Sequence, residues 1–343
     1  MNPKRHHFLP EFYLHKFARD GYVWVYDRKE DSYRRQQPKN TAVIGHYYAI
    51  TSETGERDYD IERMLSQFEG RAKTAIQTLE AGQEINPEQR ADLAYYLAFQ
   101  HTRTPRFERE IDEMADAVHK ILLKEMVPTV EAAEIVFKCK EKKGDVTAES
   151  MYKFIHEEQF SMKGSRNNTI SLMLDQTSRA SKDIALMDWV VVHAARGCSF
   201  ITTDSPIGYV VPEKFIRSGE PVIGLGSEKI TKLFPLTQKV ALLIGKYGGG
   251  FGHFRFNRTQ VRDFNLTVAR ETERFLIGRD EALVRSIVRK SNIDRAAPAT
   301  RMKVENVPHP TDPLRSFLVT RRVAADAPDI PLKYHAGSPP ESQ

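Results

Sequence analysis

Hydrophobic residues first form a regular pattern just after Gly21, in the run YVWVYDR at residues 22–28. Its β-branched and aromatic residues are typical of a strand, and the polar stretch that follows suits a turn. A second short β-prone run lies at residues 32–35. The pattern therefore predicts an N-terminal β-hairpin.

Helical spacing replaces this pattern near Tyr59, where apolar residues recur at steps of three and four: Ile61, Leu65, Phe68, Ala72, Ile76 and Leu79. Asn86 followed by Pro87 predicts the start of the next helix, because Asn favours the N-cap and Pro the first helical position. Pro105 is expected to end or kink that helix. The predicted helical block covers about residues 59–160 and includes further amphipathic stretches at 107–126, 130–143 and 148–159.

Short β-prone runs return after Lys182, separated by glycine and proline, at residues 188–195, 198–204, 207–211 and 241–247. Two helical stretches, 261–271 and 279–291, then flank a brief strand at 275–278. The glycine-rich segment KYGGGFGHFRF lies between β-prone runs and not before a helix. It therefore favours a hairpin or loop over a phosphate-binding loop.

These elements predict one α+β domain at residues 1–293: an N-terminal β-hairpin, a central helical block, and a C-terminal mixed β-sheet with helices at about 183–293. Eight of the eighteen prolines lie beyond Arg295, where clear periodicity is lost. Residues 294–343 are therefore predicted to be an extended or partly disordered tail with few regular elements.

The amino-acid composition adds little to this predicted fold. Hydrophobic residues make up 40% and charged residues 28% of the 343, which suits a globular protein that buries a substantial core. The 51 Lys and Arg exceed the 46 Asp and Glu by five, an excess compatible with a polyanionic partner but insufficient to indicate one. Cys139 and Cys198 are far apart, so we expect neither a disulfide framework nor a cysteine zinc site.

The segment MNPKRHHFLP lacks the apolar core of a signal peptide, and no run reaches the ~18 apolar residues of a membrane span. We therefore expect a cytoplasmic protein with no membrane partner. The P-loop, Rossmann, H-E-x-x-H and G-x-S-x-G patterns are all missing from the sequence, which removes support for the corresponding enzyme classes. We expect no cofactor and no metal site, with a divalent metal left open as an alternative.

Three clusters carry candidate chemistry. His6 and His7 precede Pro10 and a short aromatic helix containing Tyr13 and Phe17. Imidazoles can act as acid or base near neutral pH, whereas the structural alternative is that they hydrogen-bond the first helical turn and the aromatics are core. A functional role would require Phe12, Tyr13 and Phe17 to dock on the rest of the protein.

The second and third clusters are QHTRTP and TTDSP. Gln100 and Arg103 share a helix face and could bind a phosphate or carboxylate, or Arg103 could simply pair with a nearby acid. Asp204 follows a β-prone run and could be a catalytic carboxylate or ion ligand, or could only form the turn before Pro206.

Taken in order, HHFLPEFYLHKF, GYVWVYDR, PKN, the Tyr47–Tyr48 pair, QHTRTP, FITTDSP, LFPLT and the late helix containing Asn265 resemble the bacterial family called domain of unknown function 4238. The resemblance spans about His6 to Ser291. It implies that the motif residues of the family are His6, His7, Pro10, Tyr13, Gln100, Arg103, Asp204, Pro206 and Asn265. Ser205 stands where many members have Asn. The family supplies no activity to transfer.

Histidines, an arginine, an amide and a carboxylate would suit acid–base cleavage of a phosphodiester. Our first hypothesis is a bacterial nuclease, an RNA-directed toxin or defence effector. In it His6, His7, Arg103 and Asp204 are catalytic, and Tyr13, Gln100 and Asn265 bind substrate. The alternative is a non-catalytic module that binds nucleic acid or a protein partner. The nuclease requires the catalytic groups to meet on a solvent-open cleft, whereas burial of these groups would favour the binding module.

Overall fold

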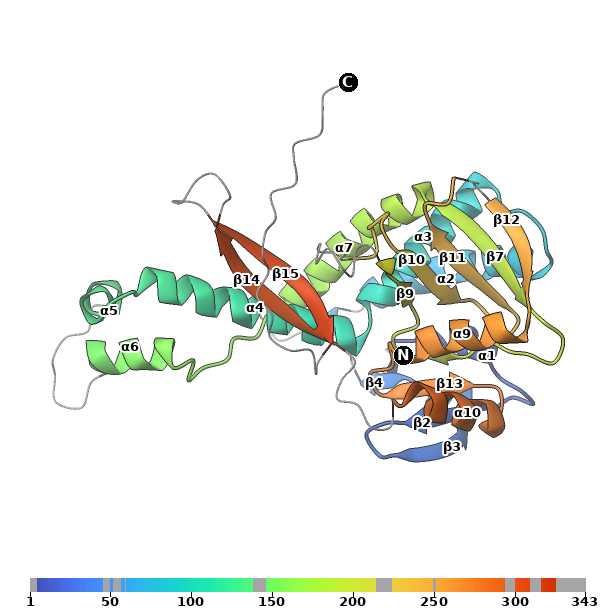
Figure 1. Cartoon of the computed structure of the whole chain (residues 1–343), viewed down its shortest axis with the longest axis horizontal. Coiled ribbons are helices and arrows are strands. Elements are labelled where there is room, and N and C mark those ends of the chain that lie inside the picture. The colour runs from blue at the N-terminus through green and yellow to red at the C-terminus, as the bar shows by residue number, and fades with distance from the viewer. Residues whose placement is uncertain are drawn as a thin grey trace, which may run out of the picture. The chain divides into compact units, whose positions relative to one another are not determined.

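The computed structural model describes residues 5–45, 50–51, 57–58, 60–137, 146–213, 224–248, 251–293, 300–308 and 316–324. The chain forms two compact units, and the boundary between them lies within helix α4 (Pro105–Met126). Unit 1 comprises residues 1–108 and 166–299, and unit 2 comprises residues 109–165 and 300–343. The predicted α+β class is confirmed (Figure 1).

Unit 1 contains a five-stranded sheet in the order β12-β7-β11-β10-β9. Its strands are β7 (Asp188–Ala194), β9 (Gly208–Val210), β10 (Thr231–Pro235), β11 (Val240–Gly245) and β12 (Phe251–Phe256). Neighbours pair antiparallel except for β12, which runs parallel to β7. The hairpin considered for KYGGGFGHFRF is wrong, because β11 is already flanked by β10 and β7. Residues 246–248 of this segment lie outside any strand, as the loop alternative predicts, whereas residues 251–256 form strand β12.

A second, four-stranded sheet of unit 1 has the order β3-β2-β13-β8. The predicted N-terminal hairpin is confirmed, since β2 (Val23–Asp27) pairs antiparallel with β3 (Ser32–Gln36). Strand β13 (Phe275–Gly278) joins β2 to β8 (Thr202–Thr203). The sheet thus joins the beginning of the chain to its late part.

Shorter elements precede the helical block. Strand β1 (Arg5–His7) pairs with β4 (Val43–Gly45), and β5 (Ile50–Thr51) pairs with β6 (Arg57–Asp58). In the sequence, helix α1 (Glu11–His15) and the short helix η1 (Pro38–Asn40) lie between β1 and β4.

The helical block contains α2 (Asp60–Glu80), α3 (Pro87–Thr102), α4, α5 (Val130–Phe137) and α6 (Ala148–His156). Asn86 caps α3 as predicted, with Pro87 at the first helical position. Helix α7 (Arg166–Leu186) was not predicted. Its buried stripe includes Thr177 and Ser181, so the apolar period is interrupted, and the helix is covered mainly by α3.

Helices α9 (Arg258–Ala269) and α10 (Glu281–Ser291) follow the predictions closely. They contribute to the main hydrophobic core of unit 1, which contains the buried residues Tyr26, Val192, Phe200, Phe264, Leu276 and Ile287. The core therefore joins residues from both sheets. None of the helices that the structure describes is long and apolar enough to cross a membrane.

The segment predicted to be an extended tail instead contains two nine-residue strands. Strand β14 (Thr300–Pro308) pairs antiparallel with β15 (Ser316–Ala324) along its whole length. Proline does not prevent this ladder, because Pro298, Pro310 and Pro313 lie outside the strands and Pro308 ends one. The end of the tail, residues 325–343, lies outside the described residues.

Candidate functional site

The N-terminal motif meets the QHTRTP motif at Arg103, in the turn that ends α3. The Arg103 side chain is 2% exposed, and its Nη1 donates to Oε1 of Glu69 on α2 at 2.7 Å. Its Nη2 donates to the backbone carbonyl of His7, and its guanidinium lies over the ring of Phe99. Arg103 therefore holds together α2, α3 and the N-terminal strand.

The other member of this motif is Gln100, one turn earlier on α3. Its side chain is fully buried, and among the described residues neither its amide oxygen nor its amide nitrogen has a hydrogen-bond partner. Tyr96 lies a further turn back on the same helix face, with its hydroxyl also buried and lacking a partner in the described part of the chain. Burial, with contributions from Tyr13 and Glu69, raises the pKa of Tyr96.

Tyr13 of α1 is fully buried, and its hydroxyl group has two polar partners elsewhere in unit 1. Its hydroxyl donates to the carbonyl of Pro235 at 2.7 Å and lies 2.7 Å from the hydroxyl of Thr202. Burial raises the pKa of Tyr13 well above its ordinary value. Phe17 is also fully buried, so the expected docking of the aromatic helix is present. Tyr13 is thus a core residue with two satisfied polar contacts.

The histidines that precede α1 lie in β1. The His6 backbone pairs with Ile44 of β4, and its side chain lies outside the described residues. His7 pairs with Val43 and presents its carbonyl to Arg103. The structure therefore brings His7 and Arg103 together through the backbone of His7.

Asp204 directly follows strand β8 and is 4% exposed. Its carboxylate accepts hydrogen bonds from the backbone N–H groups of Glu273 (3.0 Å), Arg274 (2.7 Å) and Phe275 (2.9 Å). Burial raises the pKa of Asp204 to about 6, although these three donors act in the opposite direction. Asp204 fixes the entry to β13 by satisfying three backbone donors.

Asn265 of α9, like Asp204, hydrogen-bonds backbone groups of a distant segment. The amide is 1% exposed, accepts from the backbone N–H of Ile201 at 3.0 Å and donates to the carbonyl of Ser199 at 2.9 Å. It completes the hydrogen bonds of the segment that leads into β8. The amide thus uses its oxygen and one N–H on that segment.

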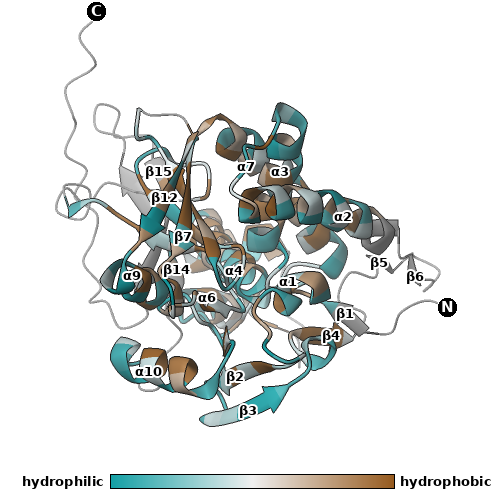
Figure 2. Cartoon of the chain, turned by 90° about the vertical axis from the view of Figure 1, so that its right-hand side faces the viewer, coloured by the Kyte–Doolittle hydropathy of each residue, from teal (hydrophilic) through white to brown (hydrophobic). Residues whose placement is uncertain are grey.

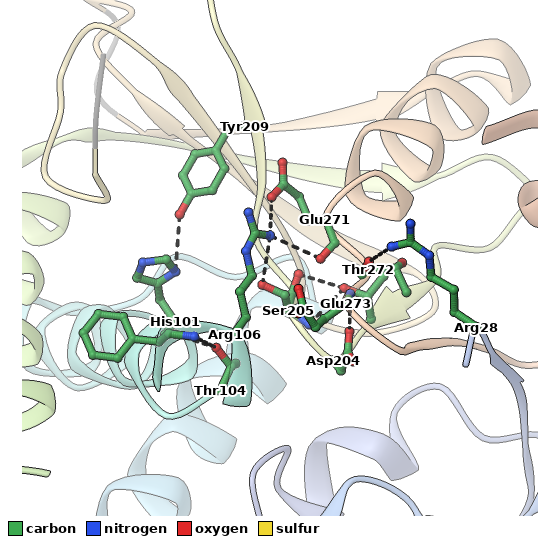
Figure 3. Close-up of polar contacts among 12 residues, drawn as sticks. Arg28, His101, Thr104, Arg106, Asp204, Ser205, Tyr209, Glu271, Thr272 and Glu273 are labelled. Carbon is green, nitrogen blue, oxygen red and sulfur yellow. Dashed lines mark hydrogen bonds and ion pairs between the residues drawn. The ribbon is translucent and has the colours of Figure 1, made fainter. Parts of the chain in front are cut away.

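A polar cluster that was not predicted surrounds the TDSP turn, and we call it the turn cluster: His101, Arg106, Ser205, Tyr209 and Glu271 (Figure 3). Arg106 Nη1 donates to Oε2 of Glu271 at 2.5 Å, to its carbonyl at 3.2 Å, and to the Ser205 hydroxyl at 3.4 Å. The Tyr209 hydroxyl lies 3.4 Å from Nδ1 of His101. Arg106 is buried, whereas His101 and Tyr209 are half-buried. His101 and Arg106 flank the predicted Arg103 in the sequence, so consideration of the whole QHTRTPR segment would have found them.

Another unpredicted feature is a set of arginine side chains stacked on aromatic rings at β3 and α10. Arg35 lies 4.1 Å from the centroid of the Tyr22 ring, and Arg285 of α10 lies 3.9 Å from that of Tyr33. Arg35 is exposed, and the Arg285 side chain is 55% exposed. We call the surface formed by residues 22–40 and 274–293, which include β2, β3, β13 and α10, the basic surface.

Charge on the basic surface is predominantly positive. Residues 22–40 and 274–293 contain ten Lys and Arg against five Asp and Glu, an excess equal to that of the whole chain. One of the acids, Asp27, is buried and binds Arg34 at 2.9 Å and Arg274 at 2.9 Å. Although burial acts to raise its pKa, these two arginines lower the pKa of Asp27. Strand β3 is hydrophilic along its length (Figure 2).

Within the part of the chain that the structure describes, no group of three or more His, Cys, Asp or Glu residues could bind a metal ion. Together, the fold and these buried motifs define an α+β protein whose family-specific polar residues mostly connect elements of unit 1. The chain belongs to the family described as Protein of unknown function (DUF4238), whose model matches residues 5–282. Searches of the curated proteins and of the solved structures gave no match.

Proposed function

We propose that this protein is a nucleic-acid-binding module and that the basic surface is its binding face. The observation that supports this proposal most directly is the pair of arginine–tyrosine stacks, Arg35 on Tyr22 and Arg285 on Tyr33. Guanidinium groups bind phosphates, and stacked arginine and aromatic planes are surfaces on which unpaired bases pack. Single-stranded RNA or DNA is therefore the partner that this surface fits.

Burial of the motif residues supports the binding module over the nuclease. Arg103, Asp204 and Asn265 are each at most 4% exposed and are bonded to other parts of unit 1. A group that neutralises or cleaves a substrate phosphate must reach that phosphate. The motifs supply the frame that positions β13, and β13 in turn pairs with β2 of the basic surface.

The test is fluorescence anisotropy of the full chain with labelled single-stranded and duplex oligonucleotides of mixed sequence, at two salt concentrations. We expect the single strand to bind more tightly and the affinity to fall as salt rises, because phosphate binding releases counterions. The double variant Arg35→Glu/Arg285→Glu should raise Kd at least about tenfold and reduce the salt slope by about two.

Arg179→Glu/Lys182→Glu is the matched control, because both residues of α7 are exposed and the pair undergoes the same double charge reversal away from β3 and α10. It should leave Kd within about twofold, since α7 lies outside the basic surface. If the control and the double variant lost affinity equally, nonspecific charge attraction would explain the binding. Absence of binding by the unaltered chain would overturn the proposal.

A second candidate is phosphodiester cleavage at the turn cluster, and a specific observation favours it. His101 and Tyr209 are only half-buried and lie 3.4 Å apart, beside the Arg106–Glu271 ion pair. In this version of the nuclease hypothesis His101 is the acid or base and Arg106 positions Ser205. Degradation of RNA and DNA should be assayed with and without chelator, using His101→Gln. Cleavage that persists in this variant would remove His101 from the reaction.

A further inference from the structure

Strand β12 is the most open edge of the five-stranded sheet. It forms one side of that sheet in Figure 1 and pairs only with β7 among the strands that the structure describes. No backbone hydrogen bond outside this ladder involves residues 251–256 in the described part of the chain. Half of the backbone donors and acceptors of a six-residue strand therefore face outward.

The other edges of the two larger sheets of unit 1 are protected in ways that β12 is not. Strand β9 has only three residues, β8 has two, and β3 contains Arg34 and Arg35. Strand β12 has six residues, no proline, no acid and one cation, Arg255. Its Phe254 is 59% exposed, the highest value for any large aromatic side chain in the described residues. An edge with this combination of length and hydrophobicity is a template for pairing with a strand of another chain.

We propose that β12 pairs antiparallel with β12 of a second copy of this chain, so that the two sheets join edge to edge in a twofold-symmetric dimer. The twofold axis must pass through a residue pair, because directly opposite residues of antiparallel strands point to the same face. Centring the axis on His253 places Gly252 opposite Phe254 and Phe251 opposite Arg255. Each Phe254 then faces a glycine and each Arg255 faces a phenylalanine, while the two His253 residues lie opposite each other on the axis.

Charge selects this register over its neighbour. With the axis on Phe254, each His253 would lie opposite an Arg255, which places two basic groups together in both halves of the interface. With the axis on His253, each Arg255 faces the ring of Phe251, an arrangement suited to a cation–π contact. This proposal does not depend on the proposed nucleic-acid binding, because β12 is no part of the basic surface.

The first experiment measures the mass of the full chain by light scattering across a concentration series. The unaltered protein should shift toward twice the monomer mass as concentration rises. Phe254→Lys should remain a monomer, because a charge replaces the exposed ring at the open edge. The control Val210→Lys should still dimerise, since Val210 is 44% exposed on the opposite edge strand β9.

The second experiment tests the register with single cysteines, after replacement of Cys139 and Cys198 by Ser. His253→Cys should form an intermolecular disulfide on mild oxidation, because directly opposite residues have Cα atoms about 4.5–5.5 Å apart. Gly252→Cys should form at least tenfold less intermolecular disulfide, since residue 252 of the second copy lies two positions away along the ladder. A monomer at every concentration, or dimerisation unaffected by Phe254→Lys, would overturn the proposal. Equal cross-linking of the two cysteines would overturn the register.

Discussion

At the scale of single residues, the polar motif side chains act mainly as connectors between segments that are distant in sequence. Asp204 illustrates this role, since one carboxylate satisfies three consecutive backbone donors at residues 273–275. A buried N–H that loses its acceptor costs about 1–3 kcal/mol. We therefore predict that Asp204→Ala lowers the free energy of unfolding by at least about 3 kcal/mol, measured by urea denaturation at pH 7. A loss below about 1 kcal/mol would contradict this role.

The same carboxyl makes a pH-dependent contribution with a defined sign. Its folded pKa is about 6, above the unfolded value of 3.8, so the native state binds more protons in between. The stability that protonation of this carboxyl adds is therefore fully present below pH 3.8 and is lost as pH rises to about 6, whereas its three backbone hydrogen bonds remain above that pH. Asp204→Asn should flatten this part of the stability profile. Urea titrations of both proteins at several pH values between 4 and 7 test this, and identical slopes would contradict it.

For Arg103 the expected cost of substitution follows from its buried ion pair with Glu69. Removing one member of a buried ion pair leaves the other charge without compensation, at a cost of about 3–5 kcal/mol. Glu69 is 24% exposed, which reduces the penalty, so we expect Arg103→Met to cost about 2–3 kcal/mol. The double variant Glu69→Gln/Arg103→Met should be less destabilised than the single one. Chemical denaturation of the set as a double-mutant cycle tests the coupling, and additive costs would contradict it.

At the scale of elements, local patterns predicted most of the helices and strands. The β2–β3 hairpin, the Asn86–Pro87 start of α3 and the late α9, β13 and α10 all follow from residues close in sequence. Helix α7 was missed because its buried face includes Thr177 and Ser181, which only the packing of α3 makes suitable. The β14–β15 hairpin was missed because proline frequency masked strands that lie between the prolines.

The candidate site was predicted less well, for a physical reason. Gln100, Arg103 and Asp204 are residue types that serve equally as ligands to a substrate and as partners to buried backbone. Sequence identifies such a residue but gives neither its exposure nor its partner, and those depend on contacts such as Arg103 with Glu69, 34 residues away. His101 follows Gln100 directly and Arg106 lies three residues after Arg103, and the sequence gives no sign that these two neighbours are the ones that approach the TDSP turn.

The pairing of β7 and β12 predicts a second pH effect. His193 Nε2 and His253 Nδ1 lie 3.0 Å apart, and burial, together with His253 and Arg255, lowers the pKa of His193. Across β11 the opposite residue is Val240, which supplies no compensating charge. Because the folded pKa lies below the ordinary value of 6.5, stability is present above that pH and is lost as pH falls below it. Urea titration from pH 7.5 to 5 in the Phe254→Lys background should show this loss, and His193→Gln should reduce it.

At the scale of the whole molecule, the two units differ in the size of their hydrophobic cores. The α5–α6 region of unit 2 has a cluster of three buried residues, Val127, Ala133 and Ile155, whereas the main cluster of unit 1 is several times larger. Burial of apolar surface is the dominant stabilising contribution, so the two units should differ in stability. Cooperative unfolding of the chain as one two-state transition is therefore not expected.

We predict that differential scanning calorimetry resolves two transitions, with unit 2 unfolding at the lower temperature. Ile155→Ala should lower the first transition and leave the second unchanged, because Ile155 belongs to the small cluster of unit 2. Ile287→Ala, in the core of unit 1, should lower the second transition. Each variant should cost about 2–5 kcal/mol, the usual range when a buried isoleucine is shortened to alanine. A single transition that both variants shift equally would show that the units unfold together, and the assignment of separate stabilities would fail.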